Sequence, residues 1–500
     1  MTFDEGQSYD DLRHSMARGA AWMIAMRWMI RGIGLINTII LARLLVPADF
    51  GLIAMASVVL AFLDSIIGLN VETPLVRNMA MGRPQYDSAW TLQVIEGVFK
   101  TGLYICIAPL IAAYFDDPRI ETIVYIIALR PGIDGFENIG QVNFRRELRF
   151  DKEFRYWVYR RLLTFLITIG IALWMRNYLA LAIAAPVGAA TAVLLSFIMS
   201  SYRPRFSLSH IGEIWAFSKW WMLSGSVRFF GHKGEEFILG GLTTPQIVGA
   251  YSVAGNYAAI LTSETILPAG RALLPNYARM LDNPPQLLRA FQLSLGLIIT
   301  LALAAGVGAS LMAEDLVLVV LGPQWYLAVP FFQWLALHSA FWCIVQSLQP
   351  YFFVTNRERL FALCGLGYIA ILIPAIVIAA HTAGAEAVPM ALAQTRTIVT
   401  ALFMLGMLGV LLFLKVFSLE KLVDVLWRPV IACTLMAICV WSLPVEFGTP
   451  LSLGIHVSIG ASVFFLTLVF LWVISGRPSG IESAIFSLAS DYVSTRRRKI

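Results

Sequence analysis

The sequence has few charged residues and no loop long enough to form a folded soluble domain. Asp, Glu, Lys and Arg make up 14% of the 500 residues, whereas 58% are hydrophobic. An average soluble domain carries about a quarter charged residues. This composition excludes an ordinary soluble protein and predicts a chain that crosses a membrane many times.

Cysteine is also scarce, and its spacing excludes two kinds of site. The five cysteines lie in apolar runs without a CxxC or Cys/His spacing: Cys106, Cys343, Cys364, Cys433 and Cys439. A disulfide framework or a metal site is therefore not expected, and the five thiols are predicted to be small buried hydrophobic groups. No cofactor is expected.

Signals for export and for nucleotide chemistry are missing as well. The N-terminal MTFDEGQSYDDLRHSMARG carries four acids and no Ala-x-Ala site follows it, which excludes a cleaved signal peptide. The first membrane helix is expected to act as its own signal. No Walker or GxGxxG element follows a predicted strand, and the predicted outer loops are short. We therefore expect no catalytic residues and no enzyme activity.

Apolar segments of membrane-spanning length are what the chain contains. Counting about 20 apolar residues per span predicts an all-α polytopic membrane protein of about 14 transmembrane helices. The predicted spans are 19–45, 50–75, 88–113, 120–142, 157–175, 179–200, 214–241, 246–268, 288–312, 327–354, 360–380, 386–414, 427–443 and 451–475.

The distribution of positive charge predicts the orientation. With the N-terminus inside, most of the 37 Lys and Arg fall in cytoplasmic segments, and only Arg43, Arg119 and Arg176 fall on the opposite side. Short cytoplasmic loops retain positive charge, so both termini are predicted to be cytoplasmic, at a bacterial inner membrane. The net charge of +6 then follows from topology, and no nucleic-acid partner is expected.

The C-terminal tail, residues 476–500, is predicted to lie on the inner leaflet. Ile481, Ile485, Leu488 and Tyr492 share one helical face, and RRRK follows near the end. This pattern is typical of an amphipathic helix attracted to anionic lipid. A solvated, unstructured tail is the alternative.

One half of the chain resembles the other. Aligning Pro47 with Pro245 also places Gly51 against Gly249 and Ala56 against Ala254, at the same point of the predicted topology. Six helices per copy keep both copies in one orientation, related by a pseudo-two-fold axis along the membrane normal. The predicted parts are two six-helix lobes, a helix pair and the cytoplasmic tail, over residues 1–200, 201–415, 416–475 and 476–500.

Several turns of the sequence resemble those of a known family. They are LARLLVPADFGLIAMA at 41–56, NFRRELRF at 143–150, ILGGLTTPQIVGAYSVA at 238–254, ILPAGRALLPNYARM at 266–280 and LGPQWYLAVPFFQWLAL at 321–337. The chain resembles the polysaccharide transporters, or Wzx-like oligosaccharide flippases, of the multidrug/oligosaccharidyl-lipid/polysaccharide exporter superfamily. The resemblance implies twelve core helices in two lobes and transport of a lipid-linked sugar unit across the inner membrane.

Arginines inside the predicted spans are the candidate substrate contacts. Arg27 and Arg31 lie four residues apart on one face of the first span and have no acid within a turn. A base at bilayer depth normally faces a cavity or a partner, and the planar guanidinium matches phosphate oxygens two at a time. With Arg271, Arg228 and Arg396, they are predicted to line a cationic cavity and hold a lipid diphosphate. The alternative is an ion pair between Arg27 or Arg31 and Asp64.

The embedded acids have two interpretations. Glu96 with Lys100, and Arg130 with Asp134, have the i, i+4 spacing of ion pairs on a cavity wall. The remaining carboxylates are candidates for proton or sodium coupling, because carboxylates at depth titrate easily. These candidates are Asp64, Glu235, Glu236 and Glu264.

Four functional classes compete. The first is a flippase for a lipid-linked oligosaccharide used in exopolysaccharide, capsule or O-antigen synthesis, working with membrane lipids, a polymerase and glycosyltransferases. A multidrug antiporter for organic cations should have an acidic cavity, which the embedded bases disfavour. A membrane polymerase or ligase should have a large outer loop, which the sequence lacks. The last class is a purely structural membrane protein.

Overall fold

The described part of the chain is helical, as the sequence predicts. A computed structural model describes residues 9–78, 81–147, 149–263, 266, 273–384, 386–443 and 448–476. Side chains are described for these residues except at 9–21, 24, 77, 216–228, 230–232 and 275. These ranges contain helices and turns but no strand. Lipid offers the backbone no hydrogen-bond partner, and a helix satisfies its own amide and carbonyl groups.

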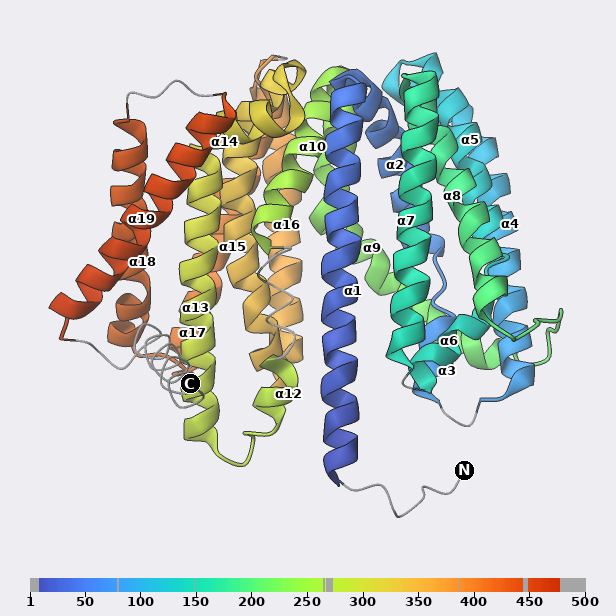
Figure 1. Ribbon diagram of the computed structural model, residues 1–500, viewed down its shortest axis with the longest axis horizontal. Coiled ribbons are helices and arrows are strands. Elements are labelled where there is room, and N and C mark those ends of the chain that lie inside the picture. The colour runs from blue at the N-terminus through green and yellow to red at the C-terminus, as the bar shows by residue number, and fades with distance from the viewer. Residues whose placement is uncertain are drawn as a thin grey trace, which may run out of the picture. The chain divides into compact units, whose positions relative to one another are not determined.

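The first of two compact units comprises Met1–Gly249. In it α1 packs along α7, α8 lies against α5 and α7, α4 lies against α5, and α9 packs on α2 and α4 (Figure 1). Its elements are α1 (Tyr9–Leu44), α2 (Pro47–Ile67), α3 (Glu72–Arg77), α4 (Arg83–Phe115), α5 (Pro118–Asp134), η1 (Ile139–Gln141), α6 (Val142–Arg146), α7 (Phe150–Met175), α8 (Tyr178–Met199) and α9 (Ile211–Leu242).

The second compact unit comprises Ala250–Ile500, and α10 (Pro245–Leu261) runs into it. Helix α15 is central and packs against α13, α16 and α17, and α18 packs against α13 and α19. The elements are α12 (Leu273–Ala278), α13 (Pro284–Leu311), α14 (Ala313–Leu316), η2 (Val317–Leu321), η3 (Pro323–Ala328), α15 (Val329–Val354), α16 (Glu358–Thr382), α17 (Val388–Phe413), α18 (Leu419–Trp441) and α19 (Pro450–Ile474).

Helix starts follow from local sequence. At α5 the Asp117 carboxylate accepts a hydrogen bond from the Arg119 backbone N–H, and Pro118 occupies the first turn. At α13 Asn283 caps in the same way ahead of Pro284. A short polar cap satisfies an amide that the helix leaves free, and proline fits the first turn because it needs no donor there. These signals keep the connections between helices short.

The predicted spans all fall on helices, and most meet a strict criterion for crossing a membrane. Eleven helices in the described ranges are long and apolar enough. The other three predicted spans fall on α5 and α10, of 17 residues each, and on α9, which are not among the eleven.

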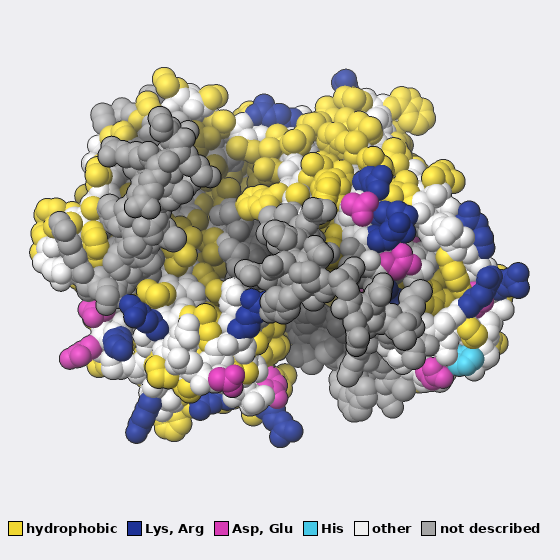
Figure 2. Space-filling view, turned by 60° about the horizontal axis from the view of Figure 1, so that its bottom comes forward, with side chains coloured by type: hydrophobic (Ala, Val, Ile, Leu, Met, Phe, Trp, Pro, Cys, Tyr) yellow, Lys and Arg dark blue, Asp and Glu magenta, His cyan; other side chains and the backbone are white. Residues whose placement is uncertain are grey.

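The outer surface is that of a multi-pass membrane protein. Trp174, Phe413 and Trp441 are 85%, 86% and 87% exposed. Figure 2 shows hydrophobic side chains over much of the upper part of this view, with charged side chains mainly at the lower left and on the right. Soluble proteins rarely expose so much contiguous apolar surface, whereas lipid covers it at no cost.

Two sequence predictions on organisation remain predictions. The lobe boundary near residue 200 was placed by the internal repeat, whereas α9 packs on α2 and α4 within the first compact unit. The amphipathic tail lies outside the described residues.

A buried cluster anchors the C-terminal helix pair within the second unit. The fully buried Asp315 of α14 accepts hydrogen bonds from the Gly448 amide at 2.6 Å and the Ser452 hydroxyl at 2.6 Å. His456 Nδ1 lies 2.6 Å from its other carboxylate oxygen. Because Ser452 and His456 lie on α19, this one carboxylate fixes the start of α19 against α14.

The cysteines follow the prediction with one exception. Cys343 and Cys433 are buried, and Cys364 and Cys439 are half-buried. Cys106 is exposed on α4, so the prediction of a buried thiol is wrong there. A hydrophobic run does not tell which face of a membrane helix meets lipid.

The two repeated turns meet each other. An added Cβ on Gly51 would lie 1.6 Å from the Pro245 carbonyl oxygen, and one on Gly249 would lie 1.9 Å from the Pro47 carbonyl oxygen. The contact is therefore reciprocal, as expected for two copies related by a two-fold axis. Only glycine allows the backbones to approach so closely.

Candidate functional site

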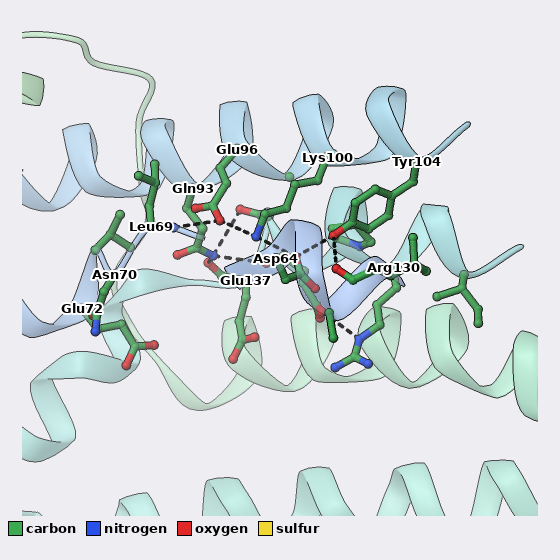
Figure 3. Close-up of a pocket in the computed structure, with 18 of the residues that line it drawn as sticks. Asp64, Leu69, Asn70, Glu72, Gln93, Glu96, Lys100, Tyr104, Arg130 and Glu137 are labelled. Atoms are coloured by element: carbon green, nitrogen blue, oxygen red, sulfur yellow. Dashed lines mark hydrogen bonds and ion pairs between the residues drawn. The ribbon is translucent and has the colours of Figure 1, made fainter. Parts of the chain in front are cut away.

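A charged cavity of about 690 Å³ opens among helices of the first unit. It lies between α2, α4, α5 and α7, and the turn that follows α2 closes one end (Figure 3). Its charged lining residues are Asp64, Glu72, Glu96, Lys100, Arg130, Asp134, Glu137 and Arg160. All of α2, α4 and α7 are apolar enough to span a membrane, so the cavity brings charge to membrane depth.

Lys100 is the centre of the first charge cluster. Its ammonium lies 2.6 Å from Glu96 Oε1 and 2.9 Å from Asp64 Oδ1, and the residue is only 8% exposed. Figure 3 shows the three side chains pointing toward one another. The Tyr104 hydroxyl donates to Asp64 at 2.7 Å. The predicted Glu96–Lys100 pair is confirmed, and Asp64 joins it from the adjacent helix.

Glu137 is the centre of the second cluster. Arg160 donates to both carboxylate oxygens, at 2.8 and 3.1 Å, and Gln141 donates at 2.9 Å. The Tyr156 hydroxyl also donates to this carboxylate. Both bonds from Arg160 come from its Nη1 atom, and such charge-assisted bonds are stronger than bonds between neutral groups. The cluster therefore ties α7 to the turn that follows α5.

Close backbone packing shapes the wall between these clusters. An added Cβ on Gly97 of α4 would lie 2.3 Å from the Pro131 carbonyl oxygen of α5. The Gln93 amide donates to the carbonyls of Asp134 at 3.1 Å and Glu137 at 3.2 Å. One side-chain amide of α4 therefore joins the end of α5 to the turn that follows it.

Outside the spanning helices, Glu72 of α3 completes the rim of the cavity. Burial raises the pKa of the Glu72 carboxyl, and the Arg145 guanidinium, 3.3 Å away, opposes that rise. Arg145 also pairs with Glu153 at 2.5 Å. Removing a carboxylate from water favours its neutral form. Glu72 therefore takes up a proton more readily than an exposed glutamate does.

Arg130 and Asp134 form the other predicted pair, which is confirmed at 3.2 Å. We expect Arg130→Gln to change the free energy of unfolding by less than about 1 kcal/mol, because half-exposed ion pairs gain little over water. The Arg130 side chain is 56% exposed. Thermal unfolding of the purified protein in detergent measures the change. A loss comparable to that of a buried pair would contradict the exposed geometry.

The predicted phosphate contacts in the described part of the chain, Arg27, Arg31 and Arg396, are not lining residues of this cavity. Arg27 and Arg31 lie half-buried on α1. In the second unit, Arg396 of α17 donates through Nε to His338 Nε2 at 3.0 Å. The side chain of Arg228, and Arg271 altogether, lie outside the described residues. The proposed role of all five arginines remains a prediction.

Of the predicted ion-coupling acids that the structure describes, Asp64 alone lines the cavity. Glu235 is buried on α9, and Glu236 pairs with Lys233 at 2.5 Å. Glu264 lies outside the described residues. Their coupling role also remains a prediction.

Arg160 is one of the lining residues that the sequence did not single out. It lies near the start of the predicted span 157–175, whereas α7 begins at Phe150, so Arg160 lies ten residues into the helix. The signal was present, because residues 150–169 contain neither glycine nor proline. An uninterrupted run of that kind predicts a helix that starts before its apolar part.

The arrangement suits binding and hydration rather than bond-making. Five carboxylates and three bases line the cavity, and the bases are held in ion pairs. Such a lining keeps water and polar groups at membrane depth, where hydrocarbon would reject them. This cavity is not itself cationic, so the predicted cationic cavity depends on the arginines named above.

Comparisons with known proteins agree with this architecture. The chain is 25% identical over 444 residues to the succinoglycan biosynthesis transport protein ExoT of Rhizobium meliloti (strain 1021), covering 87% of each protein. It is 21% identical over 395 residues to the lipopolysaccharide biosynthesis protein WzxC of Escherichia coli (strain K12), covering 78% of this chain and 80% of that one.

A solved structure shares the fold. The lipid II flippase MurJ in an inward closed conformation superposes with a TM-score of 0.71 at 12% identity, covering 91% of this chain and all of that one. A family model described as polysaccharide biosynthesis protein matches residues 40–330, more than half of the chain. The chain therefore belongs to the polysaccharide biosynthesis protein family, as the resemblance of its turns implied.

Proposed function

We propose that the protein is a flippase that moves a polyprenyl-diphosphate-linked oligosaccharide from the cytoplasmic to the outer face of the inner membrane. The supporting observation is a charged cavity of about 690 Å³ among helices that are apolar enough to span a membrane. The barrier to flipping is the passage of a polar headgroup through hydrocarbon. A hydrated cavity lowers that barrier while the lipid tail stays in the bilayer.

The relatives support the substrate class. ExoT is named for succinoglycan transport, WzxC for lipopolysaccharide biosynthesis, and MurJ for flipping lipid II. The glycan would serve exopolysaccharide, capsule or O-antigen synthesis, with glycosyltransferases supplying the substrate and a polymerase consuming the product. Reconstituted protein in liposomes that fails to flip a fluorescent lipid-linked oligosaccharide would overturn the proposal.

The mechanism is alternating access without bond-making chemistry. Both termini are cytoplasmic, and two lobes open the headgroup path to one side at a time. Asp64, with Glu235, Glu236 and Glu264, is available for proton or sodium coupling. Imposing a proton or sodium gradient on the liposomes tests that coupling. A flipping rate that changes with neither gradient would contradict the proposed coupling.

Five carboxylates around the cavity favour one second candidate, a multidrug antiporter for organic cations. Acidic linings attract cations in the same way that basic ones attract phosphates. Efflux of a cationic dye from cells that express the protein separates the two functions. Dye efflux without glycan export would replace the flippase proposal.

Arg27 and Arg31 are proposed to hold the diphosphate, so their loss should impair export. We expect Arg27→Ala and Arg31→Ala each to lower glycan export about tenfold, the effect of losing one charge-assisted contact of roughly 1.5 kcal/mol. Export is measured in cells that lack their own flippase and normalised to membrane protein level. Arg43→Ala, on the same helix near its end, is the control and should export normally. Undiminished export in both variants would remove the proposed role.

A further inference from the structure

A second cavity in the first unit has the opposite charge balance. It has a volume of about 320 Å³ and lies between α1, α5, α7 and α8. Three arginines line it, Arg130, Arg160 and Arg161, with Asp134 as the one carboxylate among its lining residues. The excess of guanidinium groups makes this cavity attractive to an anion.

Arg161 differs from the other two arginines. Arg130 pairs with Asp134 at 3.2 Å, and Arg160 pairs with Glu137 at 2.8 Å. The Nε atom of Arg161 is buried and has no hydrogen-bond partner among the described residues, where Arg161 also forms no ion pair. Leaving a buried donor of a charged group without a hydrogen bond costs free energy. An arginine kept in this state is ready to bind an anion that arrives from outside the chain.

The packing of α1 against α7 makes room for this side chain. Gly34 of α1 faces it, and an added Cβ there would lie 2.5 Å from Arg161 Nη2. Glycine therefore lets the guanidinium lie against the helix backbone. This fixes the direction of the side chain without using its hydrogen-bonding groups.

The rest of the lining suits a ligand that is anionic at one end and apolar at the other. The Arg160 guanidinium lies 5.2 Å from the centroid of the Trp157 ring. Small residues of α8 form the opposite wall, Ala184, Ala185, Gly188 and Ala189. The cavity thus places a flat aromatic surface and a smooth apolar wall beside the guanidinium groups.

We propose that this cavity binds the phosphate of a lipid diphosphate, with Arg161 as the residue that contacts it. The proposal rests on the proposed function and adds a headgroup site on α7 to the arginines of α1. The planar guanidinium can donate two parallel bonds to phosphate oxygens. Free inorganic diphosphate presents the same phosphate oxygens as the lipid headgroup. Both ligands therefore have to be tested.

The test measures binding to the full-length protein in nanodiscs. The probes are a polyprenyl diphosphate in the bilayer, inorganic diphosphate in solution and the uncharged polyprenol. We expect Arg161→Gln to weaken binding of the polyprenyl diphosphate at least tenfold, and Arg161→Lys to weaken it less. The matched control is Arg155→Gln on the same helix, where the arginine pairs with Asp151 at 2.8 Å, and we expect unchanged binding. Inorganic diphosphate should bind more weakly than the lipid. The uncharged polyprenol should show no measurable binding.

Stability provides a readout that a structural role would not give. Because Arg161 has no hydrogen-bond or ion-pair partner to lose among the described residues, Arg161→Gln should unfold at the same or a higher temperature. Polyprenyl diphosphate should raise the unfolding temperature of the wild-type protein and not that of Arg161→Gln, since a ligand stabilises the state it binds. A lower unfolding temperature for Arg161→Gln with unchanged binding would overturn the site in favour of a structural role.

The outcomes also separate this site from the proposed function. Arg161→Gln that binds polyprenyl diphosphate like the wild type overturns the site, whether or not the protein flips glycans. Tight binding of inorganic diphosphate alone overturns a lipid ligand. If the wild-type protein binds the lipid through Arg161 but flips no lipid-linked glycan, the result supports the proposed site and contradicts the flippase function.

Discussion

Replacing Lys100 with methionine is expected to lower the free energy of unfolding by about 3 kcal/mol, the cost of removing one partner from a buried ion pair. Lys100 lies between Glu96 and Asp64, at 2.6 and 2.9 Å. Without the ammonium, two carboxylates remain side by side at membrane depth. Glycan export should fall below one tenth of the wild-type level, because the charge of the cavity changes together with its shape.

The penalty should come mainly from Glu96. Its side chain is 11% exposed, whereas that of Asp64 is 51% exposed and can be hydrated. Glu96→Gln in the Lys100→Met background should therefore restore most of the stability. Glutamine can still accept the hydrogen bond that Glu96 Oε1 accepts from the Leu69 amide at 3.1 Å.

Thermal unfolding in detergent measures the three variants, and export assays in cells follow their function. Glu96→Gln alone is the matched control. It should lower the free energy of unfolding only slightly, because Lys100 still pairs with Asp64. If Lys100→Met and the double variant were equally unstable, the loss would lie in packing of the lysine stem and not in unpaired charge. Restored stability without restored export would show that Lys100 itself takes part in transport.

The local half of this cluster could be predicted from the sequence. Glu96 and Lys100 are separated by one turn of helix, and so are Arg130 and Asp134, and both pairs form. Residues four apart on a helix meet whatever the helix packs against. Apolar runs of about 20 residues likewise placed a helix at each predicted span, because membrane helices satisfy their backbones locally.

The non-local half could not be predicted. Asp64 reaches Lys100 from α2, and Arg160 reaches Glu137 from α7. These contacts depend on how each helix is rotated and how far it slides against its neighbours, which hydropathy does not encode. The sequence therefore identified embedded charges but directed attention to α1, whereas the described cavities bring together charges of α2, α4, α5 and α7.

The internal repeat did allow a long-range prediction, and it rested on three identical residue pairs. Matching Pro47 with Pro245 and Gly51 with Gly249 predicted two equivalent turns, and the structure places those turns in reciprocal contact. Conformational freedom does not explain these glycines, because neither has a positive φ. Close approach does, since each faces a carbonyl of the other turn.

Adding one methyl group at this contact is expected to be as damaging as removing Lys100. An alanine Cβ at position 51 would lie 1.6 Å from the Pro245 carbonyl oxygen, and one at position 249 would lie 1.9 Å from that of Pro47. The clash involves backbone on both sides, so a rotamer change cannot relieve it. Gly51→Ala should lower the free energy of unfolding by about 3 kcal/mol, at the upper end for overpacking, and Gly249→Ala by a similar amount.

The double variant distinguishes this explanation from two independent defects. Separating the turns once makes room for both methyl groups, so Gly51→Ala with Gly249→Ala should cost clearly less than the sum of the single variants.

Gly102→Ala is the matched control, because an added Cβ there meets nothing within 4 Å. It should leave stability unchanged or raise it by up to about 1 kcal/mol, the helix preference of alanine over glycine. Thermal unfolding of these four variants and of the wild-type protein gives the comparison. Strict additivity, or a wild-type unfolding temperature for Gly51→Ala, would mean that the two turns do not touch in the folded protein. The expected non-additivity would identify them as one contact made by two copies of the same sequence element.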